Sequence, residues 1–285
     1  MSETCYQVNN KFNNMHIKDM LEFYHLGRDK RAKCSFLLNN NYADINTLVR
    51  GGDILTIIYD EDIDFIPEHK HLDIVYEDEY FLIVNKPAGL MVHPDDKSKG
   101  GCLTNIVAGY YMAKGIKRSV KYLHRIDTDT SGLVLFAKDI LTQSYFNFLI
   151  SSHDIKREYR AIVEGTFNKD CGLINLPIGR DRHISGKRRV SNTGEEAITE
   201  YKVLKRLRGG NTLLSVLLHT GRTHQIRVHF SHLNHPLLGD SLYGGKNDLI
   251  KRQALHSYSL DFLNPYTDEH IHKECPMPRD MEKLL

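Results

Sequence analysis

The sequence is poor in the features that build disulfide or metal scaffolds. Its five cysteines are odd in number, widely spaced along 285 residues, and form no CxxC pair. Disulfide frameworks and structural zinc sites need paired cysteines at close spacings. We therefore expect reduced thiols in a cytoplasmic protein, without a disulfide framework or a structural zinc site.

Long apolar runs are also missing from the chain. Residues 1–14 are polar and lack the apolar core of a secretory signal. No uninterrupted apolar stretch approaches the roughly 20 residues that a membrane-spanning helix needs. The expected protein is soluble and has no membrane partner.

The chain also lacks a large excess of charge of one sign. The formal net charge is only +2, which by itself does not indicate a nucleic-acid partner. Basic residues nevertheless gather in residues 114–125 and 180–189, while acidic residues gather in residues 60–64 and 77–79. A nearly neutral total can hide a basic face that binds nucleic acid. Scattered, solvated charge is an equally good interpretation of the composition alone.

The chain is predicted to divide into a small N-terminal module, residues 1–66, and a larger domain, residues 67–285. The module is expected to begin with short helices and to end with a strand and a linker, because apolar periodicity gives way to Gly-Gly-Asp, an acidic stretch and proline. Its expected elements are a helix over residues 17–24, a basic turn over 28–33, a second helix around 36–38, a strand over 54–59 and a linker over 60–64.

Strand patterns outnumber helical patterns in the larger domain and do not alternate with them regularly. The expected fold class is therefore α+β, with a mixed, largely antiparallel sheet flanked by helices, rather than a doubly wound sheet. Helices are expected over residues 103–113 and 140–150. Strands are expected over residues 80–84, 133–137, 157–163, 198–204, 213–218 and 255–262.

A carboxylate in the segment 122–132 is the first candidate for chemistry. His124 and Arg125 precede Asp127, and a Thr/Ser/Gly turn and an apolar run follow it. This pattern predicts a strand that ends in a polar loop, followed by a second strand. An aspartate fixed there beside arginine is either part of a structural ion pair or a catalytic group.

Two further segments carry candidate residues. Tyr159 is expected to share one face of its strand with small apolar residues, where it either lines a pocket or packs as an ordinary core tyrosine. Arg227 lies at the edge of an apolar helical face, and Thr223 is a suitable N-cap for that helix. A half-buried guanidinium needs a carboxylate partner, and Asp127 is the obvious candidate.

Other kinds of site are not indicated. The histidines at positions 219, 224, 229, 232 and 235 lack the HExxH spacing and a fixed acidic ligand, so we expect no metal. Ser131 does not lie in a GxSxG elbow, which argues against a serine hydrolase. Residues 86–89 lack the glycine pattern of a phosphate-binding loop, and we expect no nucleotide or other cofactor.

Taken together, the segments closely resemble the RluA-type family of RNA pseudouridine synthases. The resemblance runs from about residue 72 to residue 265, and only Ile126 departs from the central motif, where the family usually has leucine. The matching motifs are His124-Arg125-Ile126-Asp127 with Thr130-Ser131-Gly132, the Tyr159 strand, residues 221–229, Val84-Asn85-Lys86-Pro87-Ala88-Gly89 with His93-Pro94, Pro177-Ile178-Gly179-Arg180, His235-Pro236 with Gly239-Asp240 and Tyr243-Gly244, and Ala254-Leu255-His256.

The resemblance implies an isomerase that converts uridines of ribosomal or transfer RNA to pseudouridine without cofactor or metal. It implies that the base is flipped out, that the glycosidic bond breaks, and that uracil rejoins through its C-5 carbon. Asp127 matches the essential residue, which attacks the anomeric carbon or removes a proton from the neighbouring ribose carbon. Arg227 matches the basic partner that keeps it ionised. Tyr159 matches the residue that stacks on uracil and helps to remove the C-5 proton, and Arg125 matches one that fills the gap left by the flipped nucleotide.

The resemblance also predicts the contacts with RNA and the role of the N-terminal module. The residues expected to bind RNA are His124, Arg125, Arg222, Lys86 and Arg180. The module resembles an S4-type RNA-binding domain, in a degenerate form, ahead of the catalytic domain. We expect a monomer. Two alternatives stay open: a catalytically silent RNA-binding or ribosome-assembly factor on the same fold, and a glycosidase with Asp129 as a second carboxylate.

Overall fold

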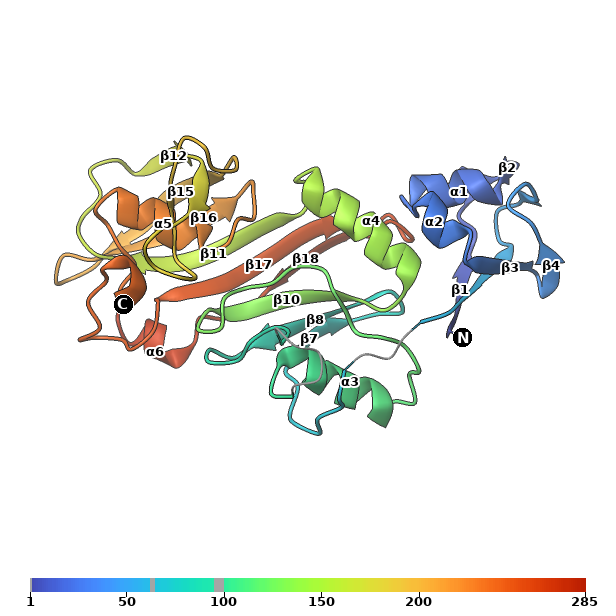
Figure 1. The fold of residues 1–285 in the computed structure, drawn as a ribbon, viewed down its shortest axis with the longest axis horizontal. Helices are drawn as coiled ribbons and strands as arrows, with labels where there is room; N and C mark the ends of the chain where they lie inside the picture. Colours follow the sequence, from blue (N-terminus) through green and yellow to red (C-terminus); the bar gives the residue numbers. More distant parts are fainter. Residues whose placement is uncertain (1, 62–64, 95–99) are drawn as a thin grey trace.

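The computed structural model describes residues 2–61, 65–94 and 100–285. It contains a small N-terminal sheet and a long central sheet that carries most of the chain (Figure 1). Residues 62–64 of the expected linker lie outside the described residues, and the domain boundary at residue 66 stays a prediction. No helix in the described ranges is long and apolar enough to cross a membrane.

The N-terminal module is a four-stranded sheet in the order β1-β6-β3-β4, with short helices packed on it. Its apolar core includes Tyr6, Ile17, Leu21 and Ile57 and extends to Leu141 of the larger domain. Its elements are β1 (Ser2–Gln7), η1 (Asn10–Phe12), β2 (Met15–His16), α1 (Ile17–Phe23), α2 (Arg28–Arg31), β3 (Cys34–Leu38), β4 (Asn41–Ala43), β5 (Leu48–Val49) and β6 (Ile54–Tyr59).

One prediction in this module is wrong. Residues 36–38 belong to β3 rather than to a second helix, and the second helix is the basic segment Arg28–Arg31. Asn39 and Asn40 both have positive φ and form the two-residue turn between β3 and β4. Turns of this kind match the twist of a hairpin. A short apolar run alone does not distinguish a strand from a helix, and the turn decides it here.

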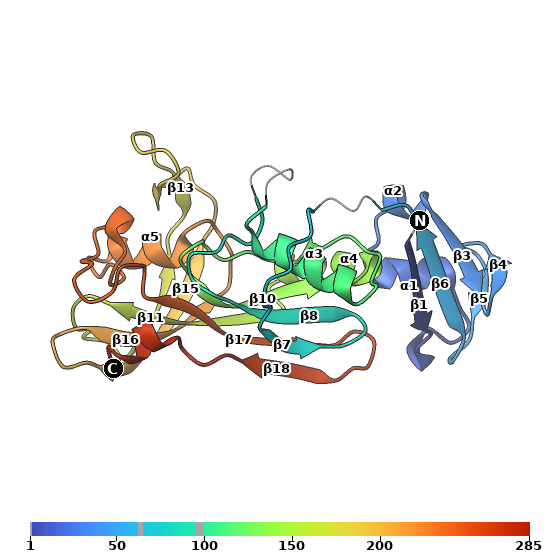
Figure 2. The same cartoon turned by 90° about the horizontal axis from the view of Figure 1, so that it is seen from below.

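The central sheet has ten strands, in the order β12-β15-β16-β11-β17-β10-β8-β7, with β18 beside β17 and β9 beside β10. Its described pairs are antiparallel except β10 with β17, so the expected mixed, largely antiparallel α+β fold is confirmed. The strands are β7 (Ile74–Glu77), β8 (Phe81–Lys86), β9 (Lys121–Tyr122), β10 (Ser131–Ala137), β11 (Lys156–Val163), β12 (Cys171–Asn175), β15 (Ile198–Arg206), β16 (Thr212–Leu218), β17 (Leu255–Leu263) and β18 (His270–Glu274). A small hairpin, β13 (Ile178–Arg180) with β14 (Arg188–Val190), stands apart from this sheet (Figure 2).

Residues 123–130 connect β9 to β10 and are called the Asp127 loop below. The parallel pair forms where the chain leaves this loop and enters β10. Gly132 has a φ of +111° and lies against Ser257 of β17, and an added Cβ would come within 2.2 Å of the Ser257 carbonyl oxygen. Only glycine combines this backbone conformation with so close an approach. All seven residues of β10 are buried, so the loop before it is fixed to the centre of the sheet.

Helices cover parts of the central sheet (Figure 1). They are α3 (Leu103–Ala113), α4 (Ile140–Ser151), α5 (Gln225–His232), η2 (Ser241–Tyr243) and α6 (Arg279–Glu282). The helices expected at 103–113 and 140–150 are confirmed. The expected N-cap of α5 is wrong, because the cap position is His224, in the left-handed conformation with φ 59°, and not Thr223.

The N-terminal module contacts the central domain near the start of α4. Tyr6 donates a hydrogen bond to Asp139, whose side chain also caps α4 by accepting from the backbone N–H of Thr142. Tyr24 of the module stacks on Tyr266, with ring centroids 5.0 Å apart. In Figure 1 the module lies at one end of the molecule and α5 lies toward the other end.

Candidate active site

The Asp127 loop connects β9 to β10 and is supported by the buried Lys86. The ammonium of Lys86 donates to the carbonyl oxygens of Pro87, Leu90 and Thr128 at 2.9, 2.6 and 2.8 Å. Three acceptors match the three N–H groups of the charged side chain. Burial acts in the other direction and lowers the pKa of Lys86 to about 7. Lys86 is fully buried, so its expected contact with RNA is wrong, and it supports the loop instead.

Arg227 of α5 joins Asp127 to a second carboxylate. Its Nη1 donates to Asp127 Oδ2 at 2.9 Å, so the predicted ion pair is present. Its Nε and Nη2 donate to the two oxygens of Asp240 at 2.7 and 2.9 Å. Burial opposes the charge on Arg227, but the hydrogen bonds and charge of Asp240, with the charge of Asp127, raise its pKa. Asp240 belongs to a matched motif, but nothing in the sequence pattern indicated that it pairs with Arg227.

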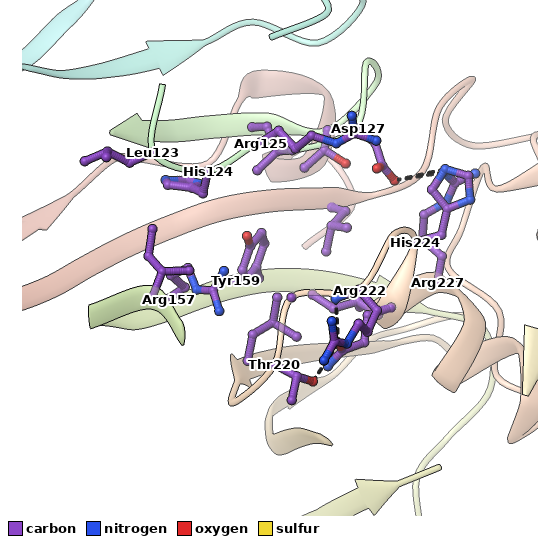
Figure 3. Close-up of a pocket in the computed structure, with 18 of the residues that line it drawn as sticks. Leu123, His124, Arg125, Asp127, Arg157, Tyr159, Thr220, Arg222, His224 and Arg227 are labelled. Atoms are coloured by element: carbon purple, nitrogen blue, oxygen red, sulfur yellow. Dashed lines mark hydrogen bonds and ion pairs between the residues drawn. The ribbon is translucent and has the colours of Figure 1, made fainter. Parts of the chain in front are cut away.

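Asp127 and Tyr159 line one pocket of about 550 Å³ (Figure 3). The pocket lies between the Asp127 loop, β11 and the segment that leads into α5. Tyr159 is on β11 with its ring directed to the core side, as predicted, and only 5% of it is exposed. Burial raises the pKa of its phenol, which favours the protonated form. The pocket therefore presents a carboxylate and a neutral aromatic ring to the same space.

His224 is a neighbour of Asp127 that was expected only as an RNA-facing or polar core histidine. Its Nε2 lies 3.9 Å from Asp127 Oδ2, and its Nδ1 is 2.9 Å from the hydroxyl of Tyr243. Burial lowers the pKa of His224, although the charge of Asp127 acts against this. The left-handed conformation at the N-terminus of α5 turns this side chain toward the carboxylate, and no helix propensity reveals such a turn.

The residues expected to bind RNA are not all at the pocket. Arg125 and Arg222 are exposed at its edge; Arg125 lies 3.3 Å from a nitrogen of His93, and Arg222 pairs with Glu195. Arg180 is exposed on the β13–β14 hairpin and does not line the pocket.

His124 lines the pocket, and its expected contact with RNA stays a prediction. It is 8% exposed, and its Nε2 accepts a hydrogen bond from the backbone N–H of Leu135 at 3.2 Å. Burial lowers its pKa to about 3, so the ring is neutral and fixes the loop against β10. In the part of the chain that the structure describes, no group of three or more His, Cys, Asp or Glu side chains could hold a metal ion.

The fold and the pocket define an α+β enzyme with one accessible carboxylate held by a buried arginine. A family model described as RNA pseudouridylate synthase matches residues 80–232, which is more than half of the chain. The chain therefore belongs to the RNA pseudouridine synthase family. It is an isomerase that converts uridine in RNA to pseudouridine.

Individual relatives agree with this family. The uncharacterized RNA pseudouridine synthase YhcT of Bacillus subtilis (strain 168) is 44% identical over 242 residues, covering 84% of this chain and 80% of that protein. Ribosomal large subunit pseudouridine synthase D of Xylella fastidiosa is 37% identical, covering 87% and 80%. The solved structure of human RNA pseudouridylate synthase domain containing 4 superposes with a TM-score of 0.61 at 25% identity, covering 74% of this chain and 90% of the human chain.

Proposed function

We propose that Asp127 is the catalytic residue of the isomerisation. The observation that carries this proposal is that the two carboxylate oxygens of Asp127 lie in different surroundings. Oδ2 accepts from Arg227, whereas Oδ1 accepts no hydrogen bond from any described residue, and a quarter of the side chain is exposed to the pocket. A carboxylate that is anchored on one side and open on the other can meet a ribose carbon without rearrangement. Attack on the anomeric carbon and removal of the neighbouring ribose proton both remain compatible with this geometry.

Arg227 and Tyr159 support the reaction in different ways. The Arg227 side chain is 8% exposed and fixes the position of Asp127 by an opposing charge and by one hydrogen bond. Tyr159 lines the pocket and supplies a buried ring on which uracil stacks. Arg125 at the edge occupies the gap that the flipped nucleotide leaves. Flipping costs a few kcal/mol, so an unpaired or loop uridine is the favoured target.

The RNA and the remaining properties are further parts of the proposal. Four bacterial relatives are named as large-subunit ribosomal pseudouridine synthases, and we propose ribosomal RNA as the first substrate to test, with transfer RNA second. The enzyme works as a monomer in the cytoplasm. The module over residues 1–66 acts as a degenerate S4-like RNA-binding domain, for which the exposed basic residues of α2 are the support.

The test is release of tritium from RNA labelled at the uracil C-5 carbon. RNA from cells that lack this gene retains the target uridine unmodified and is the substrate. Asp127→Asn is expected to abolish release, while Asp129→Asn, two positions away in the same loop and exposed, is the matched control and keeps full activity. Unchanged activity of Asp127→Asn would overturn the proposed role.

The same samples address the silent alternative and the glycosidase alternative. Equal RNA binding by wild type and Asp127→Ala, with no modification by either, would favour a factor that binds RNA without catalysis. Loss of activity in Asp129→Asn would instead favour a pair of carboxylates. Mapping pseudouridines in RNA from cells with and without the gene then identifies the uridine.

A further inference from the structure

Arg157 is a buried cation without a partner. It is 6% exposed, and its side chain makes no hydrogen bond and no ion pair with any described residue. By contrast, Arg160, Arg227 and Arg252 each contact a carboxylate. Its Nε is buried without a hydrogen-bond partner, and a largely buried guanidinium without a carboxylate is unfavourable, so proteins rarely keep one without a reason.

The position of Arg157 supplies that reason. It lies two residues before Tyr159 on β11, so both side chains are on the same face of the strand, about 7 Å apart along it, and both line the pocket. In Figure 3 the Tyr159 ring lies between Arg157 and Asp127. Burial is the main cause that raises the pKa of Tyr159. The charge of Arg157 lowers this pKa and the charge of Asp127 raises it, which also indicates that the ring lies near both.

The surroundings of Arg157 leave space for a ligand and offer it no internal counter-charge. A Cβ added to Gly221 would come within 3.0 Å of Arg157 Nη1, so the absence of a side chain there keeps room around the guanidinium. His124, on the opposite side of the pocket, has a pKa lowered to about 3 by burial and by the charge of Arg157, and it is neutral. Asp127 is already engaged by Arg227.

We propose that Arg157 binds a carbonyl oxygen of the flipped uracil and stabilises the negative charge that uracil acquires during the reaction. This inference rests on the proposed function, in which the ribose lies at Asp127 and the base lies on Tyr159. The far edge of a base placed in this way is directed toward Arg157, whereas its phosphates lie on the ribose side, near the exposed Arg125 and Arg222. A carbonyl oxygen is therefore favoured over a phosphate as the partner.

The chemical step accounts for the charge. When the bond between the anomeric carbon and N-1 breaks, its electron pair leaves with the base and is shared with the carbonyl oxygens. When C-5 then bonds to the anomeric carbon, C-5 loses a proton and N-1 gains one, so the product is an isomer of the substrate. A preorganised donor in a partly closed pocket is most effective where such charge develops.

The experiment measures single-turnover rate, RNA affinity and stability on the same variants. Its RNA is a fragment spanning the uridine that mapping assigns to this enzyme. Arg157→Met is expected to slow single-turnover conversion about 100-fold, with RNA affinity changed less than about threefold. Its free energy of unfolding is expected to be unchanged or higher, because an unpaired buried charge has been removed. Arg157→Lys keeps the charge but loses the planar fork, and is expected to be about tenfold slower.

Arg160→Met is the matched control on the same strand. Arg160 lies on the opposite face, paired with Glu158 and over the ring of Tyr258, and its replacement is expected to leave the rate unchanged. Arg157→Met could instead bind RNA more weakly at a normal rate, with the slope of log affinity against log salt concentration smaller by about one. This result would identify a phosphate contact and overturn the proposal. Reduced stability with normal rate and affinity would identify a structural arginine and overturn it as well.

Thio-substituted RNA tests the proposal on the wild-type enzyme, even if the variants do not fold. Sulfur is a weak hydrogen-bond acceptor. With 2-thiouridine or 4-thiouridine at the target position, at least one RNA is expected to react about tenfold more slowly, and Arg157→Lys is expected to discriminate less. If neither RNA is slower, Arg157 does not bind a uracil carbonyl. Asp127→Asn is measured in parallel, so that failure of the proposed role of Asp127 is seen separately.

Discussion

Arg227 contacts two carboxylates that lie in different surroundings. The side chain of Asp240 is 1% exposed and receives two hydrogen bonds from the guanidinium, whereas that of Asp127 is 25% exposed and receives one. The first geometry is bidentate and satisfied on both oxygens, which gives a fixed structural contact. The second leaves one oxygen directed to the pocket. The same arginine therefore joins a buried structural contact to the carboxylate that we propose to be catalytic.

The ion pair and the proposed catalytic carboxylate are therefore parts of one arrangement. If Asp127 were the only partner of Arg227, its movement during the reaction would leave a buried guanidinium unpaired, at a high energetic cost. Asp240 keeps Arg227 paired throughout. Lys86 and His124 fix the Asp127 loop from the other side. The supporting residues are buried, whereas a quarter of the Asp127 side chain is exposed.

The largest expected effect separates the two carboxylates by stability. Asp240→Asn leaves Arg227 with a single charged contact and is expected to lower the free energy of unfolding by about 3 to 5 kcal/mol. Asp127→Asn leaves the bidentate pair intact and is expected to change it by less than about 1 kcal/mol. Urea unfolding followed by circular dichroism measures both. Equal destabilisation by the two substitutions would remove the distinction between support and reactive group.

A smaller effect is expected from the lysine beneath the loop. Lys86→Met leaves the carbonyl oxygens of Pro87 and Leu90 without donors, removes one of the two donors to Thr128, and is expected to destabilise the protein by about 2 kcal/mol. Because the loop then shifts relative to Arg227, single-turnover conversion is expected to fall at least about tenfold. Urea unfolding and tritium release measure the two effects. Lys156→Met, an exposed lysine at the start of β11, is the control and should show neither. Normal activity in Lys86→Met would show that the loop does not depend on this support.

The sequence predicted the reactive half of this arrangement better than the supporting half. The strands and helices of the central domain, the strand face of Tyr159 and the contact between Asp127 and Arg227 could be predicted, because periodicity and turn residues act locally. Asp240 lies 13 residues after Arg227 in an irregular segment, where no periodicity relates the two. The contact between Asp240 and Arg227 depends on how the segment after α5 packs against that helix.

Buried charges were the other limit of prediction. Lysine and arginine are usually exposed, so sequence patterns place Lys86 at the surface and give no signal for the burial of Arg157. Both are buried because the chain surrounds them with backbone carbonyls or with a pocket, and these contacts join segments far apart in the sequence. The strand at residues 34–38 was missed for a related reason, since its pairing with β6 is a contact across the module.

The smallest expected effect is a pH dependence confined to the supporting region. His256 is 1% exposed, lies 2.9 Å from Ser131 Oγ at the end of the Asp127 loop, and has a pKa lowered to about 4 by burial. Its unfolded pKa is near 6.5, so the unfolded chain binds the proton more tightly. Its contribution to stability is therefore complete above pH 6.5 and is lost as the pH falls toward 4.

At pH 5.5 this loss is expected to reach about 1 kcal/mol. Urea unfolding between pH 7.5 and 4.5 is the measurement, and His256→Gln, which has no titrating ring, should show a shallower decrease over the same range. His272→Gln, an exposed histidine on β18, is the control and should retain the wild-type slope below pH 6. Since His272 has a pKa raised by its hydrogen bond to Glu274, its own contribution is present at low pH and is lost as the pH rises above its unfolded value. The contributions of the two histidines to the free energy of unfolding should therefore change with pH in opposite directions. Identical slopes in wild type and His256→Gln would show that the support by His256 is insensitive to protonation.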